Sequence, residues 1–422
     1  MGFRYRQSIK YGALRKALRL CCRNTRWKPS TAGYEYHAAR NTLQLCESLD
    51  PKNPTYKIDK YQRFWVYEPK KREIVATRLK DRQFQRSLCD GVLYPALTKS
   101  FLADNCACQK DRGVDYALDR MTWHLQRFYQ EQRRAAGNPL PFQMGGYALQ
   151  CDIHHFFESI RHDEAIRAVA KRVKDREAVQ RTAEIINSFS GDHGIGLGSQ
   201  ISQLVALTML DDMDHMIKEQ LHIRHYIRYM DDFLLFSESK EHLQHCLGVI
   251  RAYLQSIGLT LNKKTSIYPL SQGVTFLHWH FLTTDTGKVI RRIDPKKIRR
   301  ERRKLRALKA LLLKGERTME QVREHYKSAS ANIQRGNTRN IKKQLDAYYI
   351  SLFHEPPPLV GKEAEREKRK KKKEGTDHED RKRGTETEPH GAPPGNRRSE
   401  KGSPGRQDGI HRHDGGDRTA GR

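Results

Sequence analysis

The sequence lacks any apolar run that is long enough to cross a membrane. No uninterrupted hydrophobic stretch approaches the roughly 18 residues of a membrane-spanning helix. The N-terminus, MGFRYRQSIKYGALRKAL, is basic from its start and has no apolar core like that of a signal peptide. We therefore expect a cytoplasmic protein that makes no membrane contact.

The sequence also lacks cysteines in metal-binding pairs. The 8 cysteines are scattered, and the only close pairs are Cys21-Cys22 and Cys106-Ala107-Cys108. Neither pair has the C-x-x-C spacing of a zinc site, and no second pair matches either of them. Buried or free thiols in a reducing compartment are the expected state.

Acidic residues are too few to balance the basic ones. Asp and Glu number 50 against 80 Lys and Arg, which gives a formal net charge of +30. Such a surplus favours a polyanionic partner, most often nucleic acid, with an anionic membrane as the weaker alternative.

The end of the chain has no aromatic residue. From Glu355 onward the sequence contains no Phe, Trp or Tyr and is rich in Gly, Pro and charged residues. Because such a segment cannot bury enough apolar area to offset its ordering entropy, residues 355–422 are expected to form a disordered charged tail. The run Lys368–Lys373 either holds nucleic acid electrostatically or stays solvated.

The remaining residues mix helical and strand patterns. Residues 1–60 have helical spacing, mainly in Tyr11–Leu20 and Thr31–Leu49, and residues 64–79 have the pattern of a hairpin. Further helices are expected at Arg82–Leu97, 113–132, 162–188, 200–220, His242–Ile257 and 294–314, with a last helical pair ending near Phe353. Strands are expected at Tyr147–Ile153, Leu259–Leu261 and Thr275–Leu282, and a hairpin at 223–236. This mixture indicates an α+β fold.

Two adjacent aspartates interrupt an apolar hairpin. The stretch IRYMDDFLLF places Asp231 and Asp232 between two apolar runs, and Asp152 ends the strand before the helical segment 162–188. Burying unpaired carboxylates is costly, so a cation is expected beside them. If the two strands are neighbours, the three carboxylates converge and can bind Mg²⁺. Turn chemistry alone explains an Asp-Asp pair, but it does not explain Asp152.

A second acidic pair serves as a contrast. Asp211-Asp212 lies within a helical pattern. We expect it to form a solvated helix face.

The ordered set of motifs resembles the reverse transcriptases. KKREI at 70–74, D-I-x-x-F-F at 152–157 and RYMDD at 228–232 stand in that family's order. The resemblance runs from about Tyr61 to about Phe281, and more loosely through the basic region that follows. It implies an α+β right-hand polymerase with fingers, a palm built on an antiparallel sheet, and a helical thumb.

The resemblance also implies a division of the chain. A helical N-terminal extension would occupy 1–60, the fingers and palm 61–285, a basic helical thumb 286–354, and the charged tail 355–422. The activity implied is RNA-directed DNA synthesis by nucleotidyl transfer with two Mg²⁺ ions.

The family's metal ligands fall on the three aspartates. Asp152, Asp231 and Asp232 look like the metal-binding triad, with the Ile153 carbonyl as a further ligand. Lys264 looks like the lysine that protonates the leaving pyrophosphate. Lys263 is close enough to be the alternative.

The incoming nucleotide would contact the fingers hairpin and an aromatic side chain. Lys71, Arg72 and Arg78 look like the groups that hold the triphosphate, which needs cations able to donate several hydrogen bonds; a solvated turn is the alternative. Phe157 falls where the family has the aromatic gate that excludes a 2′-hydroxyl. Because Phe156 is adjacent, only one of the two rings can face the site, and a core phenylalanine is the alternative.

The glycine-rich stretch GIGLGSQISQ at 194–203 bears on the subfamily. Many relatives have Gln-Gly followed by Ser-Pro, where this chain has Leu197-Gly198 and Ser202-Gln203. Leu197, Gly198 and Gln203 are candidate contacts to the incoming dNTP, and Gly198 lets the backbone approach it closely. An apolar residue here resembles the enzymes of diversity-generating retroelements, which copy a template RNA with errors at adenines.

Other classes remain alternatives at this point. The diversity-generating enzymes commonly have Leu-Pro-Ile-Gly-Asn where this chain has Ile-Gly-Leu-Gly-Ser. Group II intron-like, retron and phage-defence reverse transcriptases are open, as is a non-catalytic RNA-binding scaffold. The partners implied are a template RNA, a primer or cDNA, dNTPs and a small helical accessory protein.

The basic region after the palm completes the resemblance. FLHWHF at 276–281 resembles the primer grip, with His278 where many relatives have Gly. In the helix at 294–314, apolar Leu305, Leu308, Leu311 and Leu312 give one side that can dock. Its expected phosphate contacts, which carry little sequence information, are Arg299, Arg300, Arg302, Arg303, Lys304 and Arg306.

Overall fold

The computed structural model describes residues 3–52, 54–67, 71–361, 364 and 367. The chain divides into two units, Met1–Leu359 and Val360–Arg422, and the elements described below belong to the first. The part of the expected tail from residue 368 onward, including the run Lys368–Lys373, lies outside the described residues.

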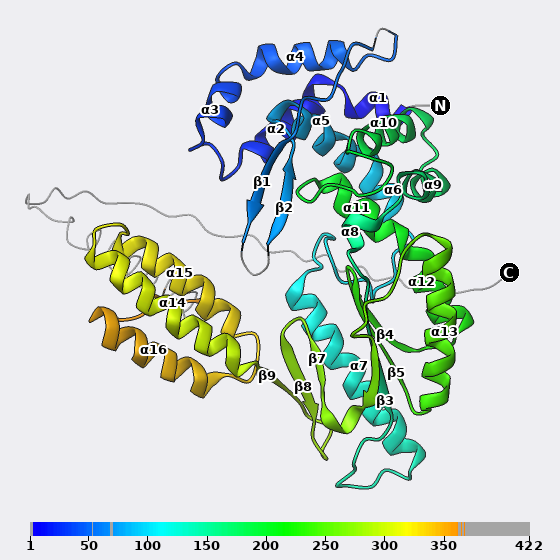
Figure 1. Ribbon diagram of the computed structural model, residues 1–422, viewed down its shortest axis with the longest axis vertical. Coiled ribbons are helices and arrows are strands. Elements are labelled where there is room, and N and C mark those ends of the chain that lie inside the picture. The colour runs from blue at the N-terminus through cyan, green and yellow to red at the C-terminus, as the bar shows by residue number, and fades with distance from the viewer. Residues whose placement is uncertain (1–2, 53, 68–70, 362–363, 365–366, 368–422) are drawn as a thin grey trace, which may run out of the picture. The chain divides into compact units, whose positions relative to one another are not determined.

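Four helices form the N-terminal part of the first unit (Figure 1). They are α1 (Phe3–Ser8), α2 (Tyr11–Cys22), α3 (Pro29–Tyr36) and α4 (Ala38–Ser48). Helix α2 buries Leu14, Ala17, Leu18 and Cys22, which lie on one face at helical spacing. The helical pattern over Thr31–Leu49 corresponds to two helices, because the chain breaks at His37 between α3 and α4.

The fingers hairpin follows these helices. Strands β1 (Gln62–Val66) and β2 (Arg72–Ala76) pair antiparallel, with Phe64 opposite Ile74, as the sequence predicts. The chain continues through α5 (Leu79–Leu88), a π-helical turn (Cys89–Leu93), α6 (Tyr94–Leu97) and α7 (Val114–Ala135). The last of these confirms the helix expected at 113–132.

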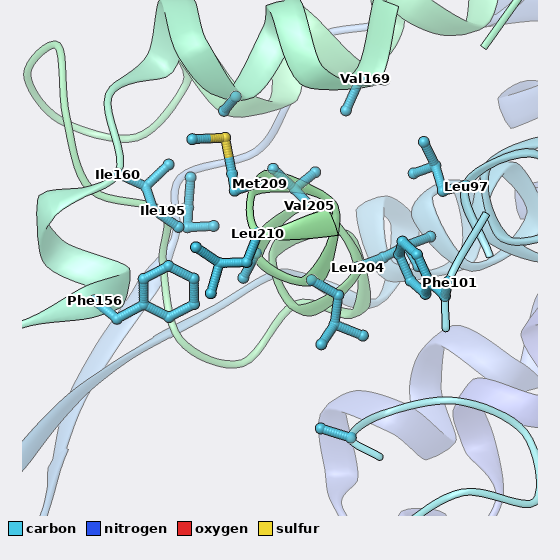
Figure 2. Packing of buried hydrophobic residues seen from close by; sticks show 14 of the residues in the cluster. Leu97, Phe101, Phe156, Ile160, Val169, Ile195, Leu204, Val205, Met209 and Leu210 are labelled. Carbon is cyan, nitrogen blue, oxygen red and sulfur yellow. The ribbon is translucent and has the colours of Figure 1, made fainter. Parts of the chain in front are cut away.

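One helix lies at the centre of the larger core. Helix α11 (Gln200–Met209) buries Leu204, Val205 and Met209, and Figure 2 shows them packed near Phe156 and Ile195. Helices α5, α6, α9 (His162–Arg172) and α12 (Asp211–His215) pack against it. The other elements of this region are α8 (Phe156–Ser159), α10 (Arg176–Asn187), which packs on α9, and a π-helical turn (Met216–Gln220). Most of this helix is buried, and only Gln200 and Gln203 of its first turn are not, which explains the apolar run LVAL that follows.

The palm sheet has four antiparallel strands in the order β4-β5-β3-β6. They are β3 (Tyr147–Asp152), β4 (His225–Tyr229), β5 (Asp232–Ser237) and β6 (Ser266–Pro269). Helix α7 packs on one face and α13 (Lys240–Ser256) on the other (Figure 1).

Both faces of the palm sheet are therefore buried. Successive residues of β5 point to opposite faces, so Phe233 and Leu235 join the core under α13 while Leu234 and Phe236 join the core under α7. This explains why the segment after Asp232 is an uninterrupted apolar run rather than an alternating one.

The strand predictions after the palm need correction. Leu259–Leu261 is not a strand, since only Leu261 forms an isolated bridge, to Ile153, and the strand that pairs with β3 is β6. Thr275–Leu282 is not one strand but a hairpin of β7 (Val274–Phe276) and β8 (Trp279–Thr283). Strand β9 (Val289–Ile293) then pairs with β8.

Three helices follow over the residues predicted to form the thumb: α14 (Pro295–Leu313), α15 (Met319–Ile333) and α16 (Arg339–Phe353). They confirm the predicted basic helix and the last helical pair. Asp294 caps α14 by accepting a hydrogen bond from the Lys296 N–H, and Pro295 takes the first helical position. Among the described residues, no helix combines the length and the apolar character that a membrane span requires.

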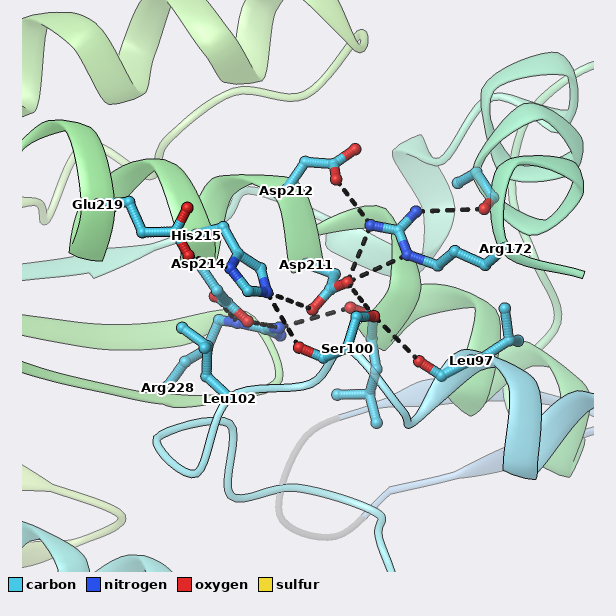
Figure 3. Close-up of polar contacts among 12 residues, drawn as sticks. Leu97, Ser100, Leu102, Arg172, Asp211, Asp212, Asp214, His215, Glu219 and Arg228 are labelled. Carbon is cyan, nitrogen blue, oxygen red and sulfur yellow. Dashed lines mark hydrogen bonds and ion pairs between the residues drawn. The ribbon is translucent and has the colours of Figure 1, made fainter. Parts of the chain in front are cut away.

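The expected solvated face at Asp211-Asp212 is wrong for Asp211. Its side chain is buried and accepts hydrogen bonds from the Arg172 guanidinium, at 2.9 Å from Nη2, and from the Ser100 hydroxyl at 2.6 Å. Figure 3 shows this cluster, in which the half-exposed Asp212 also contacts Arg172. The helical pattern around Asp211 could not reveal a partner that lies 39 residues earlier.

We expect Gly336→Ala to destabilise the contact between the last three helices and the sheet of β7, β8 and β9. A Cβ at Gly336 would lie 2.2 Å from Cζ3 of Trp279 and 2.9 Å from the Arg291 carbonyl oxygen, so buried groups would have to move. The expected loss of unfolding free energy is about 1–3 kcal/mol, measured by denaturant melts.

The matched control is Gly248→Ala. Gly248 lies in α13, and its added Cβ would meet nothing within 4 Å. This variant should be neutral or more stable by up to about 1 kcal/mol. Equal effects of the two substitutions would contradict the packing argument.

Candidate active site

The palm sheet brings the three predicted carboxylates to one end. Asp152 is the last residue of β3 and stands opposite Asp232, the first residue of β5. Asp231 lies in the turn just before Asp232, and its carbonyl accepts a hydrogen bond from the Ile153 N–H at 3.2 Å. The convergence expected from the sequence is therefore present in the backbone.

The turn that carries Asp231 has an unusual backbone. Because Tyr229 pairs with Asp232, the turn between β4 and β5 consists of Met230 and Asp231 alone. Met230 has φ +59°, a positive value at the first central position, where a type II′ turn usually has Gly. A left-handed residue other than Gly costs of order 1–3 kcal/mol and persists only where the surroundings fix it.

The Asp232 carboxylate is only partly satisfied by its surroundings. Oδ1 of Asp232 is buried and has no hydrogen-bond partner among the described residues. Burial, followed by the negative charges of Asp152 and Asp231, raises the pKa of Asp232 to about 7. Among the described residues, no group of three or more His, Cys, Asp or Glu side chains is arranged so that it could hold a metal ion. The orphaned oxygen and the charge repulsion nevertheless fit a divalent cation at this end of the sheet.

Asn262 is a site residue that the sequence analysis missed. Its Nδ2 donates to Oδ2 of Asp152 at 3.0 Å, and its backbone N–H donates to the Asp152 carbonyl at 2.7 Å. Asn262 also accepts, at Oδ1, a hydrogen bond from the N–H of Lys264. The turn at 262–265 thus places the exposed Lys264 two residues from a direct partner of Asp152, which agrees with its expected place near the triad.

A cavity of about 330 Å³ opens between the fingers hairpin and the glycine-rich loop. Lys71, Arg72, Phe157 and Leu197 line it, so four of the predicted nucleotide contacts lie together. Phe156 is buried in the core, which leaves Phe157 as the ring at the cavity, as the alternation of the two rings requires.

The cavity also contains residues that the sequence analysis did not single out. Arg63 and Trp65 of β1 and His193 of the loop are part of the lining. The Nζ of Lys71 lies 4.5 Å from the centre of the Trp65 ring, within cation–π range. Alternation along β1 places Arg63 and Trp65 on the same face, which is the signal that could have identified them.

Three predicted nucleotide contacts, Arg78, Gly198 and Gln203, lie outside this cavity lining. Arg78 stands at the N-terminus of α5, beyond the end of β2. Gln203 is exposed on the first turn of α11. These residues therefore do not share a cavity with the other predicted nucleotide contacts.

The glycine-rich loop docks against the fingers hairpin. The Val75 N–H of β2 donates to the Leu197 carbonyl at 3.0 Å. Gly198 has φ +121°, and a Cβ there would lie 3.3 Å from Ile74 Cγ2, while a Cβ at Gly196 would lie 2.6 Å from the Phe189 ring. The absence of a side chain at Gly198 therefore allows the loop to lie close to β2.

The thumb helix α14 presents most of its basic residues to solvent. Arg299, Arg300, Arg303 and Arg306 are exposed, and Leu305 is fully buried on the opposite side, as predicted. Arg302 differs, because its guanidinium lies 5.4 Å from the centre of the Tyr348 ring of α16. That side chain packs within the thumb.

Residues 117–281 match the family described as reverse transcriptase (RNA-dependent DNA polymerase). The chain contains a reverse transcriptase domain. The match covers the palm sheet and all three aspartates, and with the antiparallel sheet it confirms the predicted α+β right-hand polymerase fold.

The chain is also similar to solved structures at low sequence identity. Telomerase from Candida albicans, in complex with a TWJ fragment of telomeric RNA, has TM-score 0.43 and 11% identity over 73% of this chain and 60% of that chain. Apo telomerase from Candida tropicalis has TM-score 0.42 and 12% identity, and the chain spans 60% of its length. No curated protein matches this chain.

We expect Asp232→Asn to stabilise the metal-free protein more at pH 8 than at pH 5. The raised pKa of about 7 means that the folded state holds a proton which the unfolded state has lost. Stability therefore falls as the pH rises from about 4 through 7, and the neutral amide removes that loss. The expected gain at pH 8 is on the order of 1–3 kcal/mol, measured by urea melts in the presence of a chelator.

Asp192→Asn is the control for this comparison. The Asp192 side chain is 94% exposed and lies outside the triad. Its replacement should change the stability little at either pH. A gain at Asp232 that is the same at pH 5 and pH 8 would refute the charge-burial explanation.

Proposed function

We propose that the chain is an RNA-directed DNA polymerase of a bacterial or phage retroelement that makes cDNA from a template RNA. The observation that carries the proposal is the pairing of Asp152 with Asp232 beside the Met230-Asp231 turn. This pairing brings three carboxylates to one end of the sheet, and one of them, Asp232, has a buried oxygen without a hydrogen-bond partner among the described residues. The match of residues 117–281 to the reverse transcriptases supports the same reaction class.

Asp152, Asp231, Asp232 and the Ile153 carbonyl would hold two Mg²⁺ ions. When bound, these ions would supply activation of the primer 3′-hydroxyl and charge stabilisation for the leaving pyrophosphate. Asn262 orients the Asp152 carboxylate through its Nδ2 donor. Lys264, beside Asn262, would donate a proton to the pyrophosphate.

The cavity between the fingers and the glycine-rich loop would receive the incoming dNTP. Lys71 and Arg72 would bind its phosphates through charge-assisted hydrogen bonds. The Phe157 ring would exclude a 2′-hydroxyl by contact. Arg78, Gly198 and Gln203 remain proposed contacts that would require the nucleotide to extend beyond this cavity.

The exposed basic side of α14 would contact the phosphates of the template–primer duplex. We also propose a cytoplasmic protein that works with a small helical accessory protein. The diversity-generating class is the first candidate for its retroelement, and group II intron-like, retron and phage-defence enzymes are the alternatives.

We expect the chain to extend a DNA primer on an RNA template with Mg²⁺ and four dNTPs. Asp231→Ala/Asp232→Ala should lower the rate by at least about 10²-fold, because it removes the groups that stabilise charge in the transition state. Glu219→Ala, an exposed carboxylate paired with His215, should keep the wild-type rate. Equal rates for the wild type and the double variant would refute the proposed mechanism, and RNA binding without extension by either would favour the scaffold.

We expect wild-type products to contain excess errors opposite template adenines, and Leu197→Gln to reduce them. Gln can form a hydrogen bond to the nucleotide that Leu cannot, and one such bond gives about 1 kcal/mol of discrimination, or about fivefold. Sequencing of cDNA from both proteins measures the difference. The same error spectrum in both would remove the diversity-generating interpretation and leave the polymerase intact.

A further inference from the structure

A buried ion pair lies beneath the turn that carries the aspartates. Arg228 of β4 and Asp214 of α12 are both fully buried. The guanidinium donates to both carboxylate oxygens, at 2.7 Å from Nε to Oδ1 and 2.5 Å from Nη2 to Oδ2. The Tyr226 hydroxyl donates to the same Oδ1 at 2.6 Å. A bidentate pair of this kind fixes the plane of the guanidinium as well as its position.

The same guanidinium reaches the turn itself. Its Nη1 donates to the Met230 carbonyl at 3.1 Å, and Nη2 also points to the Leu207 carbonyl near the C-terminal end of α11, at 3.4 Å. The Met230 carbonyl belongs to the peptide unit that continues into Asp231. Its orientation therefore decides the direction in which Asp231 leaves the left-handed residue Met230.

The backbone of Arg228 is held from the other side. Strand β4 is an edge strand of the palm sheet, and residues 104–106 cover its open edge. The Arg228 N–H donates to the Asp104 carbonyl, and the Cys106 N–H donates to the Arg228 carbonyl, both at 2.9 Å. Arg228 is thus fixed at both its backbone and its guanidinium.

We propose that Arg228 is a positioning residue for the catalytic turn. Held by Asp214, it fixes the Met230 carbonyl and thereby sets the Asp231 and Asp232 carboxylates for a divalent cation. Replacing it should weaken cation binding even where the fold survives. The inference rests on the proposed function, since it assumes that these carboxylates bind the cation used in nucleotidyl transfer.

The neighbouring pair of Arg172 and Asp211 provides a matched control (Figure 3). Here too a buried aspartate of α12 pairs with a largely buried arginine from another element, and the side-chain exposures of Arg172 and Asp211 are 10% and 1%. The side-chain partners of Arg172 are Asp211, Asp212 and the Ala168 carbonyl, none of which belongs to the catalytic turn. A merely structural role would make the two pairs equivalent.

The experiment compares R228M/D214L with R172M/D211L in the full chain. Each double variant removes both charges, so no buried charge is left alone, and apolar replacement of a buried pair is often tolerated. Three quantities are measured: the melting temperature, the affinity for Tb³⁺ by luminescence without nucleic acid, and kcat and KM for dNTP in primer extension.

R228M/D214L should bind Tb³⁺ at least about 10-fold more weakly, the usual effect of losing a partner that orients metal ligands. Its kcat should fall by a similar factor with little change in the KM for dNTP. R172M/D211L should keep wild-type affinity and kcat within twofold. Wild-type Tb³⁺ affinity in R228M/D214L, or equal losses in both double variants, would overturn the proposal.

Arg228→Lys decides the question if R228M/D214L does not fold. Lysine keeps a charge for Asp214, but it cannot donate in a fixed plane to both Asp214 and the Met230 carbonyl. Weaker Tb³⁺ binding at a near wild-type melting temperature supports positioning, and wild-type binding overturns it.

The design separates this proposal from the proposed function. If the wild type extends no primer although Tb³⁺ affinity follows the expected order, the polymerase activity fails and the positioning role stands. If wild type and R228M/D214L extend primers equally well, the positioning role fails and the activity stands.

Discussion

The antiparallel pairing of β3 with β5 is the constraint on which the site depends. It runs from Tyr147 opposite Ser237 to Asp152 opposite Asp232. Because the palm sheet is buried on both faces, a slip of one residue would exchange the side chains that face α7 and α13, such as Leu234 and Leu235. Apolar residues with no part in the chemistry therefore fix the register, and the register places the carboxylates.

Bringing these carboxylates together lowers the stability of the folded protein. Asp152 has a donor in Asn262, but Oδ1 of Asp232 has no partner among the described residues, and its raised pKa reflects that burial. Buried polar groups are normally satisfied. The unsatisfied Asp232 oxygen lies at the end of a rigid sheet, beside two further carboxylates. A bound cation explains this arrangement better than poor packing does. The nearby cavity extends the argument, because Val75 and the Leu197 carbonyl tie the fingers hairpin to the glycine-rich loop and so define one wall for a ligand.

Sequence patterns predicted those parts of the site that depend on the spacing of apolar residues within one segment and on the order of segments along the chain. The hairpin of β4 and β5 and the end of β3 at Asp152 follow from apolar runs that stop at charges, and the basic face of α14 follows from helical spacing. Features that depend on distant partners were missed or wrong. Asn262 becomes a site residue only because the 262–265 turn lies against the end of β3, and Asp211 is buried only because Arg172 reaches it. The sequence pattern over Thr275–Leu282 predicts a single strand, because the Leu277-His278 turn between β7 and β8 contains neither Gly nor Pro.

That missing turn signal has a physical explanation which also applies to the catalytic turn. Leu277 and His278 have φ +50° and +67°, and Met230 has φ +59°, so both hairpins close through left-handed residues other than Gly. Such residues persist where the surrounding structure fixes them. In each hairpin one strand also pairs with a third strand, β5 with β3 and β8 with β9, so the ladders leave the turn little freedom. Glycine would relieve the backbone, but it would also free the turn in the unfolded chain and remove the side chain. The pairing of the strands thus allows each of these two turns to hold a large side chain in a fixed direction.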